Sequence, residues 1–325
     1  MKLPLIAIAG PTATGKSALG AALAHALDGE VVSCDSMQIY RGLETGTAQP
    51  TEEERALVPH HLVGFLDWDQ DFSVSDYVKA ASRVIEGIHG CGKLPFLVGG
   101  TGLYVRSLLR GFAFQPEARD ESLRESLYKE AEALGPEALH ARLAALDPQS
   151  AEDIHPHNVK RVLRALEYCL LSGEPFSRQA ERSKQVESPY RWVLFCPMLR
   201  DRQALYQRIN RRVDQMLEAG LLAEAEAFYR CCRQAAKLPT AAQSIGYKEL
   251  FPYFAGEASL EEAVENVKRE SRRYAKRQIT WFSREPGARF LYMDELGSLE
   301  AALAECIKVL GEENFIRREG GTVGI

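Results

Sequence analysis

Gly10-Pro-Thr-Ala-Thr-Gly-Lys-Ser17 lies between an apolar run, Leu3–Ala9, and a segment in which leucine recurs every fourth residue. The apolar run predicts a buried strand, and the leucine spacing predicts a helix. Between them, the octapeptide has the GxxxxGK(S/T) spacing of a phosphate-binding loop, in the strand-to-helix context that this motif requires. The N–H groups of such a loop and the helix N-terminus attract phosphate oxygens. We therefore expect diphosphate to bind at the following positions: Gly10, Pro11, Thr12, Ala13, Thr14, Gly15, Lys16 and Ser17.

Two side chains of this loop have separate expected roles. Lys16 would contact the terminal phosphate, and Ser17 would be a ligand of Mg²⁺, the one cofactor that the sequence suggests. The motif predicts diphosphate binding but not ATP hydrolysis, because an NTPase also needs an Asp at the end of a second apolar strand. Here the strand predicted over Leu94–Val98 is followed by Gly99-Gly-Thr-Gly102, which contains no carboxylate.

A carboxylate follows a different strand. The valine-rich run Glu30–Cys34 ends at Asp35, which is expected at the same edge of the sheet as the phosphate loop. Asp35 is placed to act as a general base or as a distant partner of the metal. The alternative is a turn-forming Asp that caps the next helix. Thr101 offers a hydroxyl donor at this edge, although glycine-rich loops of this kind also occur merely as tight turns.

The order of predicted elements gives the fold class. Strand, helix, strand, helix (Ser73–Gly87) and strand is the βαβ rhythm of a parallel sheet wrapped by helices. We therefore expect an α/β fold, a P-loop NTPase-like parallel sheet flanked by helices, with ligands beyond the carboxyl ends of the strands. Two later runs, Tyr190–Cys196 and Arg289–Tyr292, are expected to add strands to this sheet.

The region after Gly111 changes character, because its composition favours helices and shows no convincing strand. We expect residues 1–114 and 190–311 to form the catalytic core, residues 115–189 to form an all-helical insertion domain, and residues 312–325 to be a frayed tail. The predicted helices of the insertion and of the later core are Glu121–Leu134, Pro136–Ala145, Val159–Leu171, Arg202–Ala219, Leu221–Cys232 and Ser259–Phe282.

Basic charge is concentrated in two segments, although the formal net charge of the chain is −5. Residues 158–212 contain twelve Lys and Arg against five Asp and Glu, and residues 268–289 contain eight against two. Segregated basic charge is typical of a surface that binds a polyanion. Two solvated helical faces would give the same pattern.

The second basic segment contains two columns of Lys and Arg at every fourth residue of the helix predicted over Ser259–Phe282. The columns are Lys268, Arg272, Lys276 and Arg269, Arg273, Arg277. Like charges at this spacing repel unless acidic neighbours or RNA phosphates neutralise them, and the sequence leaves both possibilities open.

Other features of the composition restrict the class of protein. No apolar run is long enough to span a membrane, and the N-terminal stretch fits a buried first strand better than a signal peptide. The seven cysteines lack the spacing of metal ligands and indicate reduced thiols. We therefore expect a cytoplasmic protein without a membrane partner.

The ordered blocks of this chain resemble the signature of the tRNA dimethylallyltransferases. The blocks are Gly10–Ser17, Asp35–Arg41, Gly99–Tyr104, Asn158–Glu167, Gln243–Glu249 and Tyr274–Phe282. The resemblance runs from about residue 3 to residue 292, and the later blocks are individually weaker than the first three. The chain lacks the C-terminal Cys₂His₂ pattern of the eukaryotic members, so it resembles the bacterial type.

The resemblance implies transfer of the dimethylallyl group of dimethylallyl diphosphate to N6 of the adenosine beside the anticodon, in tRNAs that read codons beginning with U. In this family Asp35 would be the general base, and Thr101 would donate a hydrogen bond to the bridging oxygen. The implied partners are dimethylallyl diphosphate and a tRNA anticodon stem-loop, bound by a monomer. The implied tRNA-binding residues are Asp35, Ser36, Met37, Gln38, Thr101, Arg124, Asn158, Val159, Lys160, Arg161, Val162 and Arg164.

Three other functions remain possible from the residues. A P-loop small-molecule kinase or ATPase would share the ATP-binding type of loop, but Gly99 and Gly100 stand where its Asp is expected. A prenyltransferase acting on free adenine nucleotides would not need a basic helical insertion. A non-catalytic RNA-binding protein would have no need of Lys16, Asp35 and Thr101 together.

Overall fold

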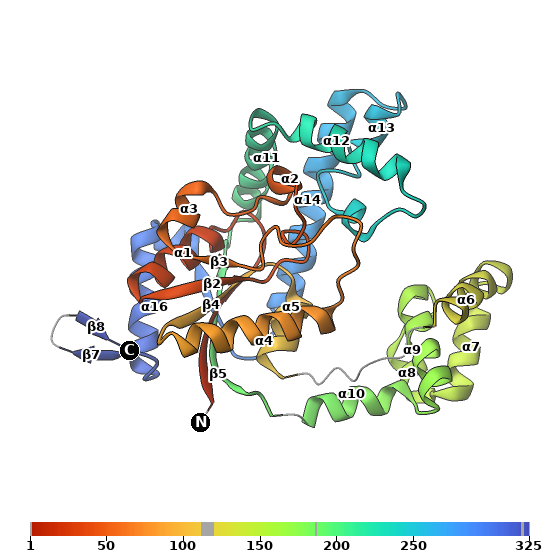
Figure 1. Cartoon of the computed structure of the whole chain (residues 1–325), viewed down its shortest axis with the longest axis horizontal. Coiled ribbons are helices and arrows are strands. Elements are labelled where there is room, and N and C mark those ends of the chain that lie inside the picture. The colour runs from red at the N-terminus through yellow and green to blue at the C-terminus, as the bar shows by residue number, and fades with distance from the viewer. Residues whose placement is uncertain (1, 112–119, 186, 320–321, 325) are drawn as a thin grey trace. The chain divides into compact units, whose positions relative to one another are not determined.

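Six parallel strands form one sheet in the order β3-β2-β4-β1-β5-β6 (Figure 1). The structure, a computed structural model, describes residues 2–111, 120–185, 187–319 and 322–324. Helices cover both faces of the sheet, which confirms the predicted α/β fold class. The strands are β1 (Leu3–Ala9), β2 (Gly29–Ser33), β3 (His60–His61), β4 (Leu94–Gly99), β5 (Tyr190–Met198) and β6 (Ala288–Tyr292).

The chain divides into two compact units, residues 1–109 with 189–325, and residues 110–188. The first unit contains the sheet and most of the helices. Its helices are α1 (Lys16–Ala26), α2 (Glu44–Thr47), α3 (Glu52–Leu57), α4 (Val74–Gly90), α5 (Gly102–Leu109), α11 (Arg202–Glu218), α12 (Leu221–Gln234), η1 (Thr240–Gln243), α13 (Phe251–Phe254), α14 (Leu260–Phe282), α15 (Met293–Leu296) and α16 (Leu299–Glu312).

The two faces of the sheet follow from the alternation of side chains along each strand. In β1, Ile6 and Ile8 pack into the cluster beneath α1 and α16, whereas Leu5 and Ala7 pack into the cluster beneath α4 and α5. All four side chains are fully buried. A continuous apolar run such as Leu3–Ala9 is what a strand covered on both faces requires.

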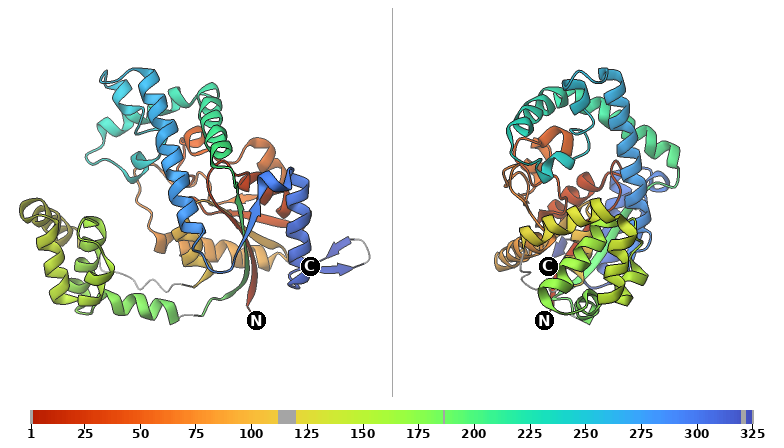
Figure 2. Two further views of the ribbon diagram at one scale, coloured as in Figure 1. Left: turned by 180° about the vertical axis from the view of Figure 1, so that it is seen from behind. Right: turned by 90° about the vertical axis from the view of Figure 1, so that its right-hand side faces the viewer.

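A third apolar cluster lies away from the sheet and joins α11, α12 and α14 to the segment that follows β2. Tyr247 and Phe228 lie at its centre, with their rings edge to face at a centroid distance of 5.6 Å. Two further views show the long helix α14 passing from α13 to α5 (Figure 2). This cluster therefore attaches the helices α11–α14 to one end of the sheet.

The second unit is helical in all of its described secondary structure. Its core consists of apolar side chains from four helices, among them Leu127, Leu143 and Leu166. The helices are α6 (Glu121–Leu134), α7 (Pro136–Leu146), α8 (Pro148–Asp153), α9 (Val159–Ser172) and α10 (Phe176–Gln185).

Two regions differ from the sequence-based expectation. His60 and His61, which lie outside every predicted strand, form a short strand on β2, where His61 Nε2 lies 2.7 Å from Glu30 Oε2. In the segment expected to fray from residue 312, Phe315 and Ile316 are buried against the sheet, because α16 brings the chain back onto it. Beyond them β7 (Arg317–Glu319) pairs antiparallel with β8 (Thr322–Gly324).

Candidate active site

Three loops meet at one edge of the sheet because β2, β4 and β1 are neighbours and run parallel. The phosphate loop follows β1, Asp35 follows β2, and Thr101 follows β4. Backbone hydrogen bonds join these loops: Gly10 N–H donates to Gly99 O at 3.3 Å, and Thr101 N–H donates to Cys34 O at 3.1 Å. The topology thus brings together three groups that are far apart in sequence.

The phosphate loop has the conformation that its motif predicts. Gly15 adopts φ 87°, a left-handed conformation that favours glycine, and α1 begins at the next residue. Inside the loop the Thr14 hydroxyl donates to Pro11 O at 2.9 Å. Lys16 Nζ donates to the same carbonyl at 3.4 Å. The ammonium group therefore lies within the loop in which a diphosphate is expected.

The loop after β2 holds its carboxylate through the backbone. Met37 N–H donates to Asp35 Oδ1 at 3.0 Å, so one oxygen of Asp35 is oriented by its own loop. Ser36 N–H donates to Thr101 Oγ1 at 2.9 Å, and the Thr101 hydroxyl lies 3.3 Å from Ser36 Oγ. Gln38 Nε2 donates to Ala48 O at 2.8 Å, which ties this loop to the segment after α2.

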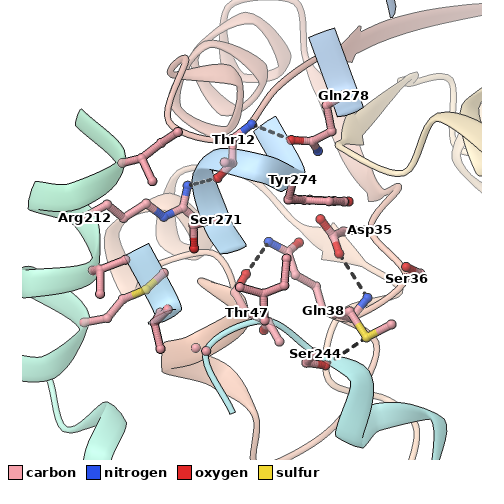
Figure 3. Close-up of a pocket in the computed structure, with 18 of the residues that line it drawn as sticks. Thr12, Asp35, Ser36, Gln38, Thr47, Arg212, Ser244, Ser271, Tyr274 and Gln278 are labelled. Atoms are coloured by element: carbon pink, nitrogen blue, oxygen red, sulfur yellow. Dashed lines mark hydrogen bonds between the residues drawn. The ribbon is translucent and has the colours of Figure 1, made fainter. Parts of the chain in front are cut away.

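Helices α11 and α14 contribute side chains to the site that had no predicted role there, although Tyr274 and Gln278 belong to the block Tyr274–Phe282 (Figure 3). Arg212 on α11 donates to Thr12 Oγ1 at 3.0 Å. Gln278 on α14 accepts a hydrogen bond from Thr12 N–H at 2.9 Å. Tyr274, one turn before Gln278, lies beside Asp35 (Figure 3). Arg212 lies in a predicted helix without a motif, so no local signal distinguished it from a surface arginine.

These groups line one cavity of about 250 Å³. Its wall includes cationic side chains, the Asp35 carboxylate and an apolar group of Met37, Ile209, Val213, Met216 and Val267. Seven of the predicted site residues line the cavity: Thr12, Lys16, Ser17, Asp35, Ser36, Met37 and Gln38. Thr101 does not line it directly and contacts it through Ser36. The cations are Lys16, Arg212, Lys248 and Arg277.

The electrostatics of the cavity favour an anion. Burial, and after it the charge of the neighbouring Arg212, lower the pKa of Lys16 to about 8, whereas Asp35 opposes the shift. Burial also lowers the pKa of Arg212. Burial and the nearby Asp35 raise the pKa of Tyr274, which keeps its hydroxyl protonated and able to donate. Two cations whose charge is penalised by burial gain from a bound polyanion.

The basic columns of α14 are neutralised mainly by acidic neighbours. Lys268 Nζ lies 2.6 Å from Asp214 Oδ1, and Arg272 lies 2.9 Å from Glu265. Arg269 and Arg273 both pair with Glu270. Lys276 and Arg277 form no ion pair with any residue that the structure describes. With Arg106, Thr280, Trp281 and Arg284 they line a second, open cavity.

A glutamate on α12 orders the segment beside the cavity. Glu224 accepts hydrogen bonds from the N–H groups of Glu44, Thr45 and Gly46 at 3.0–3.1 Å. The Tyr247 hydroxyl donates to Glu224 Oε1 at 2.5 Å and accepts from Gly46 N–H at 3.1 Å. Since Gly46 and Thr47 line the cavity, Glu224 and Tyr247 shape its wall without touching its contents.

The predicted tRNA-binding residues of the helical unit have different environments. Lys160 and Arg161 are exposed on α9, and Asn158 is exposed immediately before it. Arg124 and Arg164 both donate to Glu167 Oε2, at 3.0 and 3.1 Å. Their positive charge is thus partly balanced by a buried carboxylate.

Two apolar members of the same prediction belong to the packing of this unit. Val162 is completely buried and Val159 packs against the same cluster. The side chain of Val162 is therefore not available to a partner, because the face of α9 that contains it forms the core. The prediction of Val162 as an RNA contact is corrected to a core position.

Within the described ranges, no group of three or more His, Cys, Asp and Glu side chains converges as a metal-binding cluster. None of the helices in the described part of the chain combines the length and the apolar character that a membrane span requires.

Comparison with known proteins identifies relatives along nearly the whole chain. A family model described as IPP transferase matches residues 38–285, and one described as isopentenyl transferase matches residues 3–58. The tRNA dimethylallyltransferase of Halalkalibacterium halodurans is 47% identical over 286 residues, which are 87% of this chain and 88% of the relative. That of Bacillus subtilis is 47% identical over 285 residues, 86% of this chain and 88% of the relative.

Solved structures give the same result. The tRNA isopentenylpyrophosphate transferase of Bacillus halodurans has a TM-score of 0.69 at 42% identity, covering 96% of this chain and 98% of that one. A eukaryotic dimethylallyltransferase acting on tRNA has a TM-score of 0.81 at 28% identity, covering 96% of this chain and 80% of that one. Together with the phosphate loop and Asp35 in one cavity, these matches show that the chain belongs to the IPP transferase family, that of the tRNA dimethylallyltransferases.

Proposed function

We propose that the chain transfers the dimethylallyl group of dimethylallyl diphosphate to N6 of the adenosine immediately 3′ to the anticodon, in tRNAs that read codons beginning with U. The strongest support is that three kinds of group line one cavity: the phosphate-loop Lys16, the Asp35 carboxylate and an apolar wall. Lys16 suits the phosphates of a diphosphate ester, and the apolar wall suits its short hydrocarbon group. The Asp35 carboxylate suits an acceptor that must lose a proton.

In the proposed reaction the bond between C1 of the dimethylallyl group and the bridging oxygen breaks, and its electron pair leaves with diphosphate. The N6 lone pair forms the new bond to C1, and Asp35 accepts the proton that N6 loses. A general base of this kind contributes ~10²–10⁴-fold to a rate. Because Met37 N–H holds Oδ1 of Asp35, we assign the proton to Oδ2.

The negative charge that develops on diphosphate would be stabilised by groups already in place. Lys16 and Arg212 line the cavity, and the N–H groups of the loop lie at the start of α1. Fixed cations and N–H donors of this kind usually provide the largest single contribution to catalysis. The Thr101 hydroxyl would exchange its contact with Ser36 for the bridging oxygen.

The residues present also fit Mg²⁺, which binds proteins through one or two oxygen ligands and takes the rest from phosphates and water. The Ser17 hydroxyl and the Asp35 carboxylate both line the cavity and are oxygen donors of the required kind. Ser17 would hold the ion, and diphosphate and water would provide its other ligands, which leaves Asp35 free to act as the base. Bound Mg²⁺ would add positive charge beside the diphosphate oxygens.

For the acceptor we propose a tRNA anticodon stem-loop, whose adenine must leave its stack at a cost of a few kcal/mol. Lys160 and Arg161 would contact backbone phosphates, with Asn158 beside them. In the first unit, Lys276, Arg277 and Arg284 line an open basic cavity that suits the same polymer. Phosphate contacts of this kind position the RNA rather than reading its sequence.

The residues at the end of β4 argue against a kinase or ATPase. The strand beside β1 that would need a terminal Asp ends in Gly99 and Gly100, and the carboxylate follows β2 instead. We also propose that the enzyme is cytoplasmic and acts as a monomer.

The test is a transfer assay with radiolabelled dimethylallyl diphosphate and Mg²⁺. Acceptors are an anticodon stem-loop with adenosine at the target position, the same stem-loop with guanosine there, and AMP, with ATP turnover followed in parallel. The proposal predicts label in the adenosine stem-loop alone. Label in AMP would assign the enzyme to free nucleotides, and ATP turnover without transfer would refute the proposal.

A further inference from the structure

Gln278 joins the two loops between which the proposed reaction takes place. Its side chain is 5% exposed and lies on α14, far in sequence from both loops. Gln278 Oε1 accepts from Thr12 N–H in the phosphate loop at 2.9 Å. Gln278 Nε2 donates to Gly100 O, the carbonyl before Thr101, at 3.0 Å. One buried amide therefore bridges the diphosphate end of the site and the Thr101 end. Figure 3 shows the first of these bonds, between Gln278 and Thr12.

The contact requires this side chain on chemical grounds. A single group must accept from one backbone N–H and donate to one backbone carbonyl, and only a side-chain amide or a protonated carboxyl does both in this shape. The backbone of the Thr101 loop also lies close to the Gln278 side chain, since a Cβ on Gly100 would collide with Gln278 Nε2. That Cβ would lie 3.7 Å from Asp35 Oδ2, which places the Asp35 carboxylate near the bridge.

The bridge affects more than the two atoms that it joins. Since Thr12 N–H is bound to Gln278, this amide is not available to a phosphate, and the diphosphate must use the later amides of the loop. The Thr12 hydroxyl in turn accepts from Arg212 at 3.0 Å, so the orientation of Thr12 also sets that of the arginine. The groups that bind the leaving diphosphate are thereby fixed relative to Thr101.

We propose that Gln278 is a positioning residue, which sets the spacing between the diphosphate loop and the loop of Thr101 and Asp35. This inference rests on the proposed function. The spacing matters because the bond to diphosphate must break at the phosphate loop while the bond to N6 forms beside Asp35. Misplacement of reacting groups by about 1 Å can lower a rate by ~10²-fold. Gln278 itself contacts backbone groups rather than the reacting atoms.

The experiment compares two variants of similar shape. Gln278→Glu keeps the acceptor for Thr12 N–H but, when ionised, repels Gly100 O. Gln278→Met removes both hydrogen bonds and does not titrate. A carboxyl at this position would be buried and near Asp35, and both effects raise a carboxyl pKa. Gln234→Glu, on an exposed residue at the end of α12, is the matched control for the change in charge.

The measurement is the single-turnover rate of dimethylallyl transfer to the adenosine stem-loop, from pH 6 to pH 8.5, relative to wild type at each pH. We expect Gln278→Met to be slower by about tenfold or more at every pH. Gln278→Glu should be equally slow at high pH and recover as the pH falls, because the protonated carboxyl can again donate to Gly100 O. Gln234→Glu should follow wild type throughout.

Recovery is measured on one preparation of one variant, so a rate reduced by misfolding would not return as the pH falls. The inference would be overturned by a Gln278→Met rate within about twofold of wild type, or by a Gln278→Glu ratio that stays constant across the pH range. If wild type itself transfers no label, the proposed function fails. If wild type transfers label and the ratio is constant, only the role of Gln278 fails.

Discussion

The Thr101 hydroxyl accepts a hydrogen bond from Ser36 N–H at 2.9 Å, so the ends of β4 and β2 are joined directly beside Asp35. The loop that contains the proposed base, Asp35, is thus bonded to the hydroxyl that we propose as a donor, while Met37 N–H orients the carboxylate itself. Their distance from the diphosphate loop is set separately, by Gly10, Gly99 and Gln278.

Replacing Asp35 by Asn should separate catalysis from binding. The amide oxygen can still accept from Met37 N–H, but the amide cannot take a proton from N6. We expect transfer to fall by ~10²–10⁴-fold, with affinity for the stem-loop nearly unchanged. Transfer rates and filter binding on the same preparation test this. An equal loss of RNA affinity would refute Asp35 as the base.

Diphosphate affinity should decrease above pH 8, because the pKa of Lys16 is lowered to about 8 in the free protein. A bound diphosphate favours the charged lysine, so affinity is constant below this pKa and falls as pH rises through it. Calorimetric titration with inorganic diphosphate and Mg²⁺ from pH 6.5 to 9.5 measures the decrease. In Lys16→Arg the side chain stays charged, so this variant controls for the ionisation of diphosphate itself. Parallel curves for the two proteins would contradict the prediction.

Removing the exposed cations of α9 should weaken RNA binding through electrostatics alone. For Lys160→Ala with Arg161→Ala we expect the slope of log K against log salt concentration to decrease by about one for each phosphate that the protein no longer neutralises. Lys129→Ala, an exposed lysine on α6, is the control and should leave the slope unchanged. An unchanged slope in the double variant would show that this face does not bind RNA.

Glu224→Ala should destabilise the protein, because the N–H groups of Glu44, Thr45 and Gly46 lose their common acceptor. We expect the free energy of unfolding to decrease by about 1–3 kcal/mol. Glu226→Ala, two residues along the same helix, removes an exposed ion pair with Arg230 and should cost about 0–1 kcal/mol. Urea denaturation of both variants gives the comparison, and equal losses would contradict the role assigned to Glu224.

The parts of the fold that follow from local pattern were predictable. Leu3–Ala9 is β1 as predicted, and the phosphate loop has its expected conformation, because both depend on a short stretch of sequence. The strand at His60–His61 is too short to show any alternation. The sequence of α16 contains a weak helical pattern, because Ala302, Cys306 and Leu310 recur every fourth residue. The pattern is weak because two of these side chains are small.

The site was predictable only where a motif contains the residue. Lys16, Ser17 and Asp35 were found because each lies directly at a strand end or a helix start. Arg212 and the role of Gln278 depend on where α11 and α14 pack, and no short stretch of sequence encodes that. Val162 shows the opposite error, because a matching block includes core positions as well as contacts.

The most direct test of the central claim is to count both products of a single turnover. The wild-type enzyme, an adenosine stem-loop and labelled dimethylallyl diphosphate should give one released diphosphate for each alkylated adenosine. Digestion of the RNA should then place the label on N6 of the adenosine next to the anticodon. Diphosphate released without label in the RNA, or label on another nucleoside, would contradict the assignment of Asp35 and the phosphate loop to a transfer reaction.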